Sequence, residues 1–110
     1  MTNEFEYNDL SELSKGATLV HLAVEKRDID YLNRVDIDKL LDKDVDGETP
    51  LHYAAVNSDI EICKLLISRN PTIIWIKDIE NKTAYDWVRE YNEEYNSHID
   101  LCDYFKNINI

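Results

Sequence analysis

Glycine and proline are scarce in this sequence, with two of each among 110 residues. That scarcity argues against a β-sandwich, which needs many tight turns. Basic residues are also few, since 12 Lys and Arg stand against 23 Asp and Glu, and the net charge is −11. Phosphate binding requires a basic face, so the composition disfavours nucleic acids and anionic membranes as partners and favours a basic partner.

The chain has only two cysteines and they form no CxxC pair, which fits a reducing compartment better than a disulfide scaffold. No apolar run is long enough for a membrane span, and the first ten residues, "MTNEFEYNDL", lack the features of a signal peptide. We therefore expect a cytoplasmic protein. The length fits one small domain, and a hydrophobic content of 44% suits a modest core.

One pattern occurs three times along the chain. The segments "GATLVHLAV" (16–24), "DGETPLHYAA" (46–55) and "NKTAYDWV" (81–88) each place a turn residue two positions before a threonine that opens a short apolar helix. A second stretch of helical periodicity follows each one: "DIDYLNRV", "DIEICKLLIS" and "HIDLCDYFKN". Offsets of 31 and 34 residues between the copies are typical of stacked helix pairs.

Local chemistry supports a helix start in each copy. Thr18, Thr49 and Thr83 stand where an N-cap hydroxyl belongs, and Pro50 takes the first helical position of the central copy. Gly47 precedes Thr49 by two residues and tolerates the positive φ of a tight turn. These signals predict where the first helix of each pair begins.

The central copy, "DVDGETPLHYAAVNSDIEICKLLISRN" (44–70), resembles the ankyrin repeat, whose pattern runs Asp-x-x-Gly-x-Thr-Pro-Leu-His-x-Ala-Ala before its second helix. The resemblance implies an all-α fold, a solenoid of stacked helix-turn-helix pairs with hairpin-like loops between them. We expect one domain over residues 1–110. Its expected parts are an N-terminal cap at 1–13 and repeats at about 14–44, 45–78 and 79–110.

The outer copies depart from the central one. The two helices of the third copy lie five residues further apart, and the excess falls near 89–97, within "REYNEEYNS". This insertion predicts either a longer first helix or an enlarged loop between the helices. The irregular stretch "DIDKLLDKD" (36–44) follows the first copy, so its second helix is expected to be short.

Aromatic residues also recur at the repeat spacing. Leu22, Tyr53 and Trp87 are equivalent in the three first helices and are expected to pack as a ladder. Trp75 lies between the second and third repeats beside three isoleucines, and we expect most of this apolar stretch to pack on the stack.

His21 and His52 occupy the same position in successive repeats. The resemblance implies a structural role for both, with rings that hydrogen-bond the backbone of the neighbouring loop, and a structural role for Thr49 and Pro50. No HxxxH, HExxH or CxxC spacing favours a metal, and the acidic run from residue 42 lacks the closing Glu of a calcium loop. We predict no catalytic residue, no metal and no cofactor, and therefore a protein that is not an enzyme.

The resemblance also implies a binding surface, formed by loop tips and first helices along one concave face. In the central and third repeats the expected contact positions are Val45, Asp46, Glu48, Val56, Asn57, Ile79, Glu80, Lys82, Glu90 and Tyr91. In the first repeat they are Ser14, Lys15, Ala17, Glu25 and Lys26. This mixture of acidic and apolar side chains predicts a partner protein with a basic, or a mixed basic and apolar, patch.

Two functions of this kind stay open at the level of sequence. One is a protein–protein interaction module that acts as a virulence effector or adaptor, in the host cytosol if it is secreted. The alternative is an immunity or inhibitor protein that blocks a basic toxin or enzyme.

Overall fold

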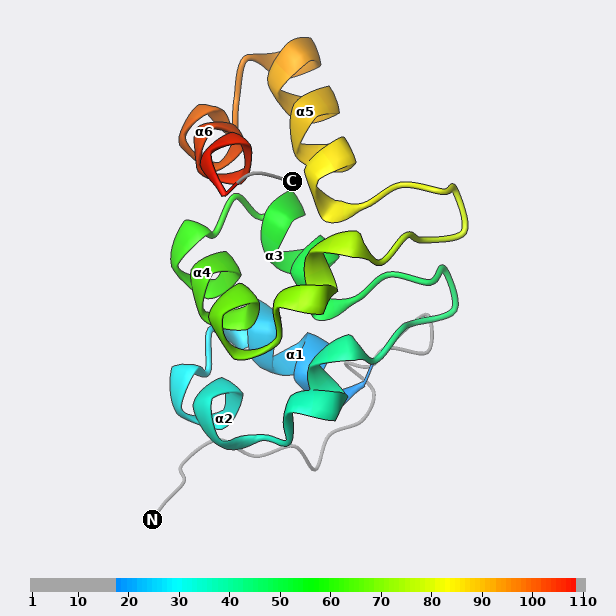
Figure 1. Cartoon of the computed structure of the whole chain (residues 1–110), viewed down its shortest axis with the longest axis vertical. Helices are drawn as coiled ribbons and strands as arrows, with labels where there is room; N and C mark the ends of the chain where they lie inside the picture. The colour runs from blue at the N-terminus through cyan, green and yellow to red at the C-terminus, as the bar shows by residue number, and fades with distance from the viewer. Residues whose placement is uncertain (1–17, 109–110) are drawn as a thin grey trace.

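The computed structural model describes residues 18–108, which form three pairs of helices stacked one on another (Figure 1). The expected cap at 1–13 and residues 14–17 of the expected first repeat lie outside the described residues. The pairs are α1 (Leu19–Lys26) with α2 (Ile29–Arg34), α3 (Pro50–Val56) with α4 (Ile60–Arg69), and α5 (Ala84–Tyr95) with α6 (Ile99–Asn107). Short 3-10 helices, η2 (Ile37–Leu41) and η3 (Pro71–Trp75), follow the first two pairs. No strand occurs between residues 18 and 108, so the predicted all-α fold class is confirmed.

The first helix of each pair begins at the predicted threonine. Thr18, Thr49 and Thr83 are the N-caps of α1, α3 and α5. Thr49 Oγ1 accepts a hydrogen bond from the His52 N–H at 3.4 Å, and Thr83 Oγ1 accepts one from the Asp86 N–H at 3.2 Å. Each bond satisfies an N–H group that has no partner inside its helix, which fixes the start of the helix at that residue.

Helix lengths decide between the alternatives that the sequence left open. Helix α5 has 12 residues whereas its counterpart α3 has 7, so the insertion of the third repeat lengthens the first helix. The extended helix ends at Asn96, which adopts the left-handed conformation at φ 53°. Helix α2 has only 6 residues, which confirms the prediction of a short second helix in the first repeat.

The core lies between the two helix layers and runs through all three pairs. Its fully buried side chains come from every α-helix and from both 3-10 helices: Val20, Leu32, Leu40, Leu51, Ile62, Leu66, Ile73, Val88, Leu101 and Phe105. Cys63 and Cys102 are buried as free thiols, and burial raises the pKa of the Cys63 thiol. The core is therefore continuous along the stack, and each pair is stabilised by its neighbours.

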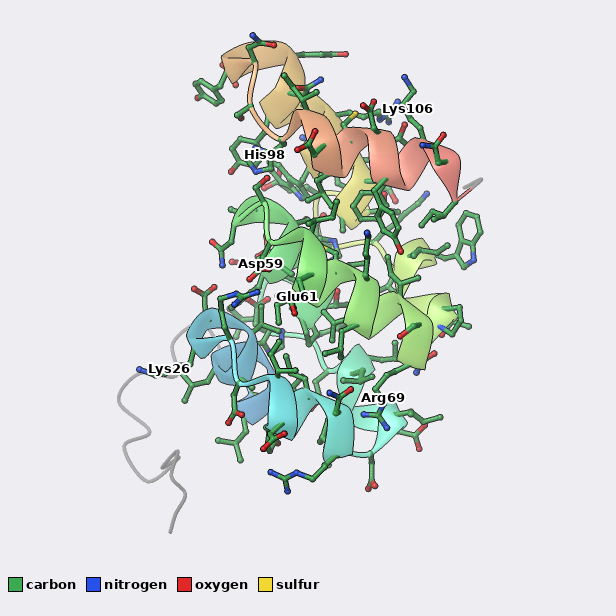
Figure 2. All side chains as sticks on the ribbon, turned by 90° about the vertical axis from the view of Figure 1, so that its left-hand side faces the viewer. Lys26, Asp59, Glu61, Arg69, His98 and Lys106 are labelled. Carbon is green, nitrogen blue, oxygen red and sulfur yellow. The ribbon has the colours of Figure 1, made fainter. Side chains whose placement is uncertain are left out.

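Polar contacts join the first two pairs on the side formed by the second helices. Asp59 and Glu61 lie at the start of α4 and Arg69 lies at its end, as the view onto this side shows (Figure 2). Arg27 forms ion pairs with Asp59 at 2.6 Å and with Glu61 at 2.7 Å. At the other end, Arg69 Nη1 donates to two carbonyl groups in the last turn of α2 and just after it, at 2.9 and 2.6 Å. These contacts fix the rotation of α4 relative to the first pair.

The apolar stretch between the second and third pairs is divided between core and surface. Ile73 is fully buried, as expected. Trp75 is the exception in this stretch, with a side chain that is 60% exposed. The stretch folds as the 3-10 helix η3, and only part of its perimeter faces the stack, so two apolar residues this close in sequence have opposite environments.

Candidate binding surface

Two hairpin-like loops project from the stack on the side away from α2, α4 and α6, one before α3 and one before α5 (Figure 1). Each loop is closed by a backbone hydrogen bond, from Asp44 N to Glu48 O at 3.0 Å and from Asp78 N to Lys82 O at 2.9 Å. The side chain of the first aspartate in each loop also accepts hydrogen bonds from backbone N–H groups of the same loop. Asp44 Oδ1 accepts from the backbone N–H groups of Asp46 and Glu48, both at 2.9 Å, and Asp78 repeats this pattern.

An aromatic side chain from the following helix holds each of these aspartates. The Tyr53 hydroxyl donates to Asp44 Oδ2 at 2.7 Å, and the Trp87 indole N–H donates to Asp78 Oδ2 at 2.6 Å. Burial, with help from this hydrogen bond, raises the pKa of Tyr53. Tyr53 and Trp87 were expected from the sequence to pack in a ladder, and their polar role was not predicted. The shared 34-residue offset of the two aspartates and the two aromatic residues is the signal that could have revealed it.

The two loop tips contact each other. The Ile79 N–H donates to Asp46 O at 2.9 Å. Gly47 has φ 76°, and a Cβ atom there would lie 3.1 Å from Ile79 N and 3.2 Å from Asp78 Cα. Glycine is therefore favoured both by the positive φ and by the close approach of the second loop. The loops form one continuous edge of the molecule.

His21 and His52 connect each first helix to the next loop. His21 Nε2 lies 2.8 Å from Glu48 O, and His52 Nε2 lies 3.0 Å from Lys82 O. On the other side of each ring, Nδ1 accepts from a threonine backbone N–H, at 3.0 Å for Thr18 and 3.1 Å for Thr49. A carbonyl only accepts and a backbone N–H only donates, so both rings are neutral with the proton on Nε2.

Burial lowers the pKa of both histidines below the ordinary value of 6.5. The carbonyl hydrogen bonds and the carboxylate of Asp44 act in the opposite direction, but for both rings the effect of burial is larger. Protonation would also place a proton on Nδ1, facing the threonine N–H that now donates to it. The folded state therefore favours the neutral form of both rings.

The ten contact residues expected in the central and third repeats lie on the loop edge and along α3 and α5. Val45 and Ile79 stand at the two loop tips, with 66% and 70% of their surfaces exposed. Val56 and Asn57 are exposed at the opposite end of α3. In the first repeat, Glu25 and Lys26 are exposed at the end of α1, and the other three expected positions, 14, 15 and 17, are outside the described residues.

In the third repeat, several of the expected contact residues already interact with other side chains of the same chain. Lys82 Nζ forms an ion pair with Glu90 at 2.6 Å and lies 4.3 Å from the centre of the Trp87 ring. Glu90 is thus already paired with a cation of the same chain. Tyr91 stacks on His98 with ring centres 5.1 Å apart, and His98 Nε2 lies 2.9 Å from Val56 O. None of these contacts was predicted from the sequence, because each depends on how the side chains lie in the folded chain.

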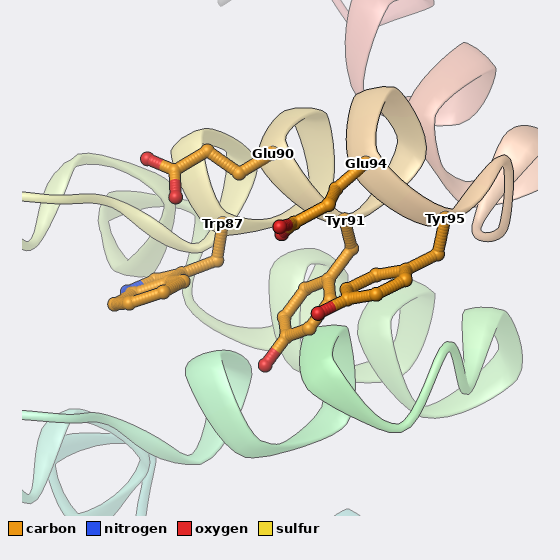
Figure 3. A pocket seen from close by; sticks show the side chains of 5 residues that line it. All are labelled: Trp87, Glu90, Tyr91, Glu94 and Tyr95. Carbon is orange, nitrogen blue, oxygen red and sulfur yellow. The ribbon is translucent and has the colours of Figure 1, made fainter.

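A shallow hollow of about 170 Å³ lies along α5 (Figure 3). Its lining comes from one face of the helix: Trp87, Glu90, Tyr91, Glu94 and Tyr95. Glu90 and Tyr91 were predicted as contact residues, whereas Trp87, Glu94 and Tyr95 were not. The spacing of four residues between successive aromatic residues places them on one face of a helix and could have indicated this surface.

A family model described as ankyrin repeats in three copies matches residues 2–86. The chain belongs to the ankyrin-repeat family. The predicted family is therefore confirmed. No curated protein matches the sequence. Ankyrin repeats bind other proteins, and domains built from them are typically binding modules without catalytic activity.

The matched segment ends in the first turn of α5, yet the third helix pair has the architecture of an ankyrin repeat. It follows a loop closed like the preceding one, begins at a threonine N-cap and packs its second helix, α6, against α5. Asn81, with φ 65°, takes the place that Gly47 has in the preceding loop. The third pair thus continues the ankyrin stack with a lengthened first helix.

Within residues 18–108 of this ankyrin domain, no three His, Cys, Asp or Glu side chains come together in a group that could hold a metal ion. Over the same residues, no helix combines the length and the apolar character that crossing a bilayer requires.

The histidine geometry predicts acid sensitivity. The folded-state pKa values of His21 and His52 are lowered, so their contribution to stability is complete above about pH 6.5 and is lost as the pH falls below it. Each ring can remove at most about 1.4 kcal/mol per pH unit within that window. We expect the free energy of unfolding, measured with urea at several pH values, to fall between pH 6.5 and 5, before most carboxylates titrate. A flat profile over this window would contradict the neutral, Nε2-protonated assignment.

Proposed function

We propose that this ankyrin-repeat domain recognises a partner protein through its loop tips and first helices, and that the partner has basic side chains beside an apolar patch. The observation that carries the proposal is the pair of loop tips, where Val45 and Ile79 are 66% and 70% exposed on loops joined by a hydrogen bond. Exposed aliphatic side chains at a fixed edge of the molecule are typical of interface anchors. The net charge of −11 supports a basic partner.

The internal order of the loops supports this role. Asp44 and Asp78 each accept backbone hydrogen bonds from their own loop and a third bond from an aromatic side chain. The loops are thereby held in one conformation before any partner arrives. A preorganised surface loses less conformational entropy on binding, so more of its contact energy becomes affinity.

For the biological role we propose a binding protein of the cytoplasm, an adaptor or effector that acts on its partner without chemistry of its own. The strongly acidic composition equally supports the alternative, an inhibitor that covers a basic toxin or enzyme. The two differ in what happens to the partner. An inhibitor abolishes the activity of the bound partner in a purified assay, whereas an adaptor leaves that activity intact.

Replacing Val45 and Ile79 together by serine is expected to weaken binding of the partner at least about tenfold, because both anchors are lost. The partner is first captured from a lysate of the source organism with the immobilised parent domain and identified by mass spectrometry. Binding of the purified partner is then measured as on- and off-rates at several salt concentrations. We expect the double variant to raise the off-rate, and the on-rate of the parent to fall with salt.

The matched control is Ile99→Ser, which removes a similar aliphatic side chain, 49% exposed, from the start of α6 in the other helix layer. It should leave the affinity unchanged. Parent-like affinity of the Val45 and Ile79 double variant, with intact helicity, would show that the loop edge is not the interface. Loss of binding in Ile99→Ser alone would place the interface on the layer of α2, α4 and α6.

A further inference from the structure

Helix α5 presents more aromatic and acidic side chains to the surface than its counterparts. The five residues by which it exceeds α3 bring Tyr91, Glu94 and Tyr95 into a segment that the shorter helix lacks. Tyr95 is 63% exposed, so packing does not account for its presence. The ring centres of Tyr91 and Tyr95 lie 6.1 Å apart, and Glu94 is beside them (Figure 3).

Elsewhere on α5, two pairs made of an aromatic ring and a carboxylate each bind a cationic side chain of the same chain. Lys82 Nζ lies 4.3 Å from the centre of the Trp87 ring and 2.6 Å from a carboxylate oxygen of Glu90. This arrangement combines a cation over a ring with an ion pair to a carboxylate on α5. Arg89 forms a second arrangement of the same kind.

In that second arrangement, the guanidinium of Arg89 lies 5.0 Å from the centre of the Tyr85 ring. Arg89 Nη2 is also 2.6 Å from Asp86 Oδ1. The guanidinium thus lies over the Tyr85 ring while its Nη2 donates a hydrogen bond to Asp86. One helix therefore carries two examples of a cation held jointly by a ring and a carboxylate.

The third combination, Tyr91 and Tyr95 with Glu94, has the same elements without a cation of the chain. Within residues 18–108, Glu94 makes no ion pair. The hollow of about 170 Å³ opens beside it, between the Trp87 ring and the two tyrosine rings. Its size is that of a side chain, and its walls offer ring faces and carboxylate oxygens.

We propose that this hollow binds an arginine side chain of the partner protein. The inference rests on the proposed function and names the anchor that the partner inserts. Arginine fits better than lysine because its planar guanidinium stacks on aromatic rings, is weakly hydrated, and donates two parallel hydrogen bonds to a carboxylate. The net charge of −11 favours the approach of a cationic segment.

The test uses the full chain and three blocked pentapeptides, Gly-Ser-X-Ser-Gly, in which X is arginine, lysine or citrulline. Citrulline keeps the shape of arginine and lacks its charge. Binding is followed by NMR through the indole N–H of Trp87 and the backbone amides of α5. We expect saturable shifts with the arginine peptide and at least about tenfold weaker binding of the citrulline peptide, with lysine between them.

Variants then assign the site. Glu94→Gln and Tyr95→Ala should each weaken the arginine peptide about three- to tenfold, and Tyr95→Phe should retain binding because it keeps the ring. Glu93→Gln and Trp75→Ala are the matched controls, since both side chains are exposed and neither lines the hollow. Circular dichroism of each variant verifies that helicity is unchanged, and binding by the controls should equal that of the parent.

Equal binding of the arginine and citrulline peptides, or of parent and Glu94→Gln, would overturn the proposal. Equal binding of arginine and lysine would overturn the choice of arginine. If the peptides fail while the Val45 and Ile79 double variant still loses the partner, the arginine site is wrong and the proposed interface stands. If the arginine peptide behaves as expected while that double variant keeps the partner, the site stands and the loop-edge interface is wrong.

Discussion

Replacing Phe105 by alanine is expected to lower the free energy of unfolding by about 3–5 kcal/mol. Phe105 is fully buried on the last helix, and its ring stacks on Tyr85 of α5 with centres 5.5 Å apart. The substitution removes the largest fully buried side chain of α6 and leaves a cavity that the surrounding helices fill only in part. The measurement is urea unfolding followed by circular dichroism.

The control is Asp103→Ala on the same helix, where the side chain is exposed. A surface change of this kind should alter the free energy of unfolding by no more than about 0.5 kcal/mol. A loss below about 1 kcal/mol for Phe105→Ala would mean that α6 is not an integral part of the stack. Because repeats are coupled mainly to their neighbours, the loss should also raise hydrogen exchange in α5 more than in α1.

The order of the helix pairs could be predicted from the sequence because it depends on local signals. A threonine N-cap, Pro50 at the first helical position and Gly47 in the preceding turn each act within a few residues. The same signals recur at a fixed offset, so each copy supports the interpretation of the others. The fold therefore followed from short segments, with little information about contacts between them.

The lengthened third repeat could not be predicted in full from local signals. A count of residues between two helices cannot tell a longer helix from a longer loop. In the added turns of α5, Tyr91 stacks on His98 across the turn that joins α5 to α6, and Asn96 adopts the left-handed conformation just after the helix. The first of these is a tertiary contact, and nothing in the local sequence specifies it.

The candidate site was predicted only in part for the same reason. Val45 and Ile79 follow from their position in the loop, but the pairing of Lys82 with Glu90 changes the charge of the strip and was not foreseen. Nor was the hydrogen bond between Trp87 and Asp78, which turns a packing residue into a support for the loop. Side-chain pairs of this kind are set by distances in the folded chain, which the repeat register does not contain.

Replacing His52 by alanine is expected to lower the free energy of unfolding by about 2–4 kcal/mol. The ring is 1% exposed and connects Thr49, at the start of α3, to the carbonyl group of Lys82 in the next loop. Alanine leaves a buried N–H and a carbonyl without their partner, at roughly 1–3 kcal/mol for unsatisfied groups, and adds a cavity. Urea unfolding at pH 7.5, where the histidine is neutral in both states, gives the value.

A second readout separates the hydrogen-bonding role of His52 from its volume. Two buried rings with lowered pKa values, His21 and His52, produce the acid sensitivity of the parent, so removing one should reduce the slope between pH 6.5 and 5 to about half. A buried ring without these hydrogen bonds would contribute to the slope in the same way, because burial is the main cause of the lowered pKa, so the hydrogen bonds are tested by amide exchange. Faster hydrogen exchange at the Thr49 amide should accompany the change, since this N–H loses its acceptor. An unchanged slope together with a protected Thr49 amide would contradict the assignment of His52 as a buried ring that hydrogen-bonds both Thr49 and Lys82.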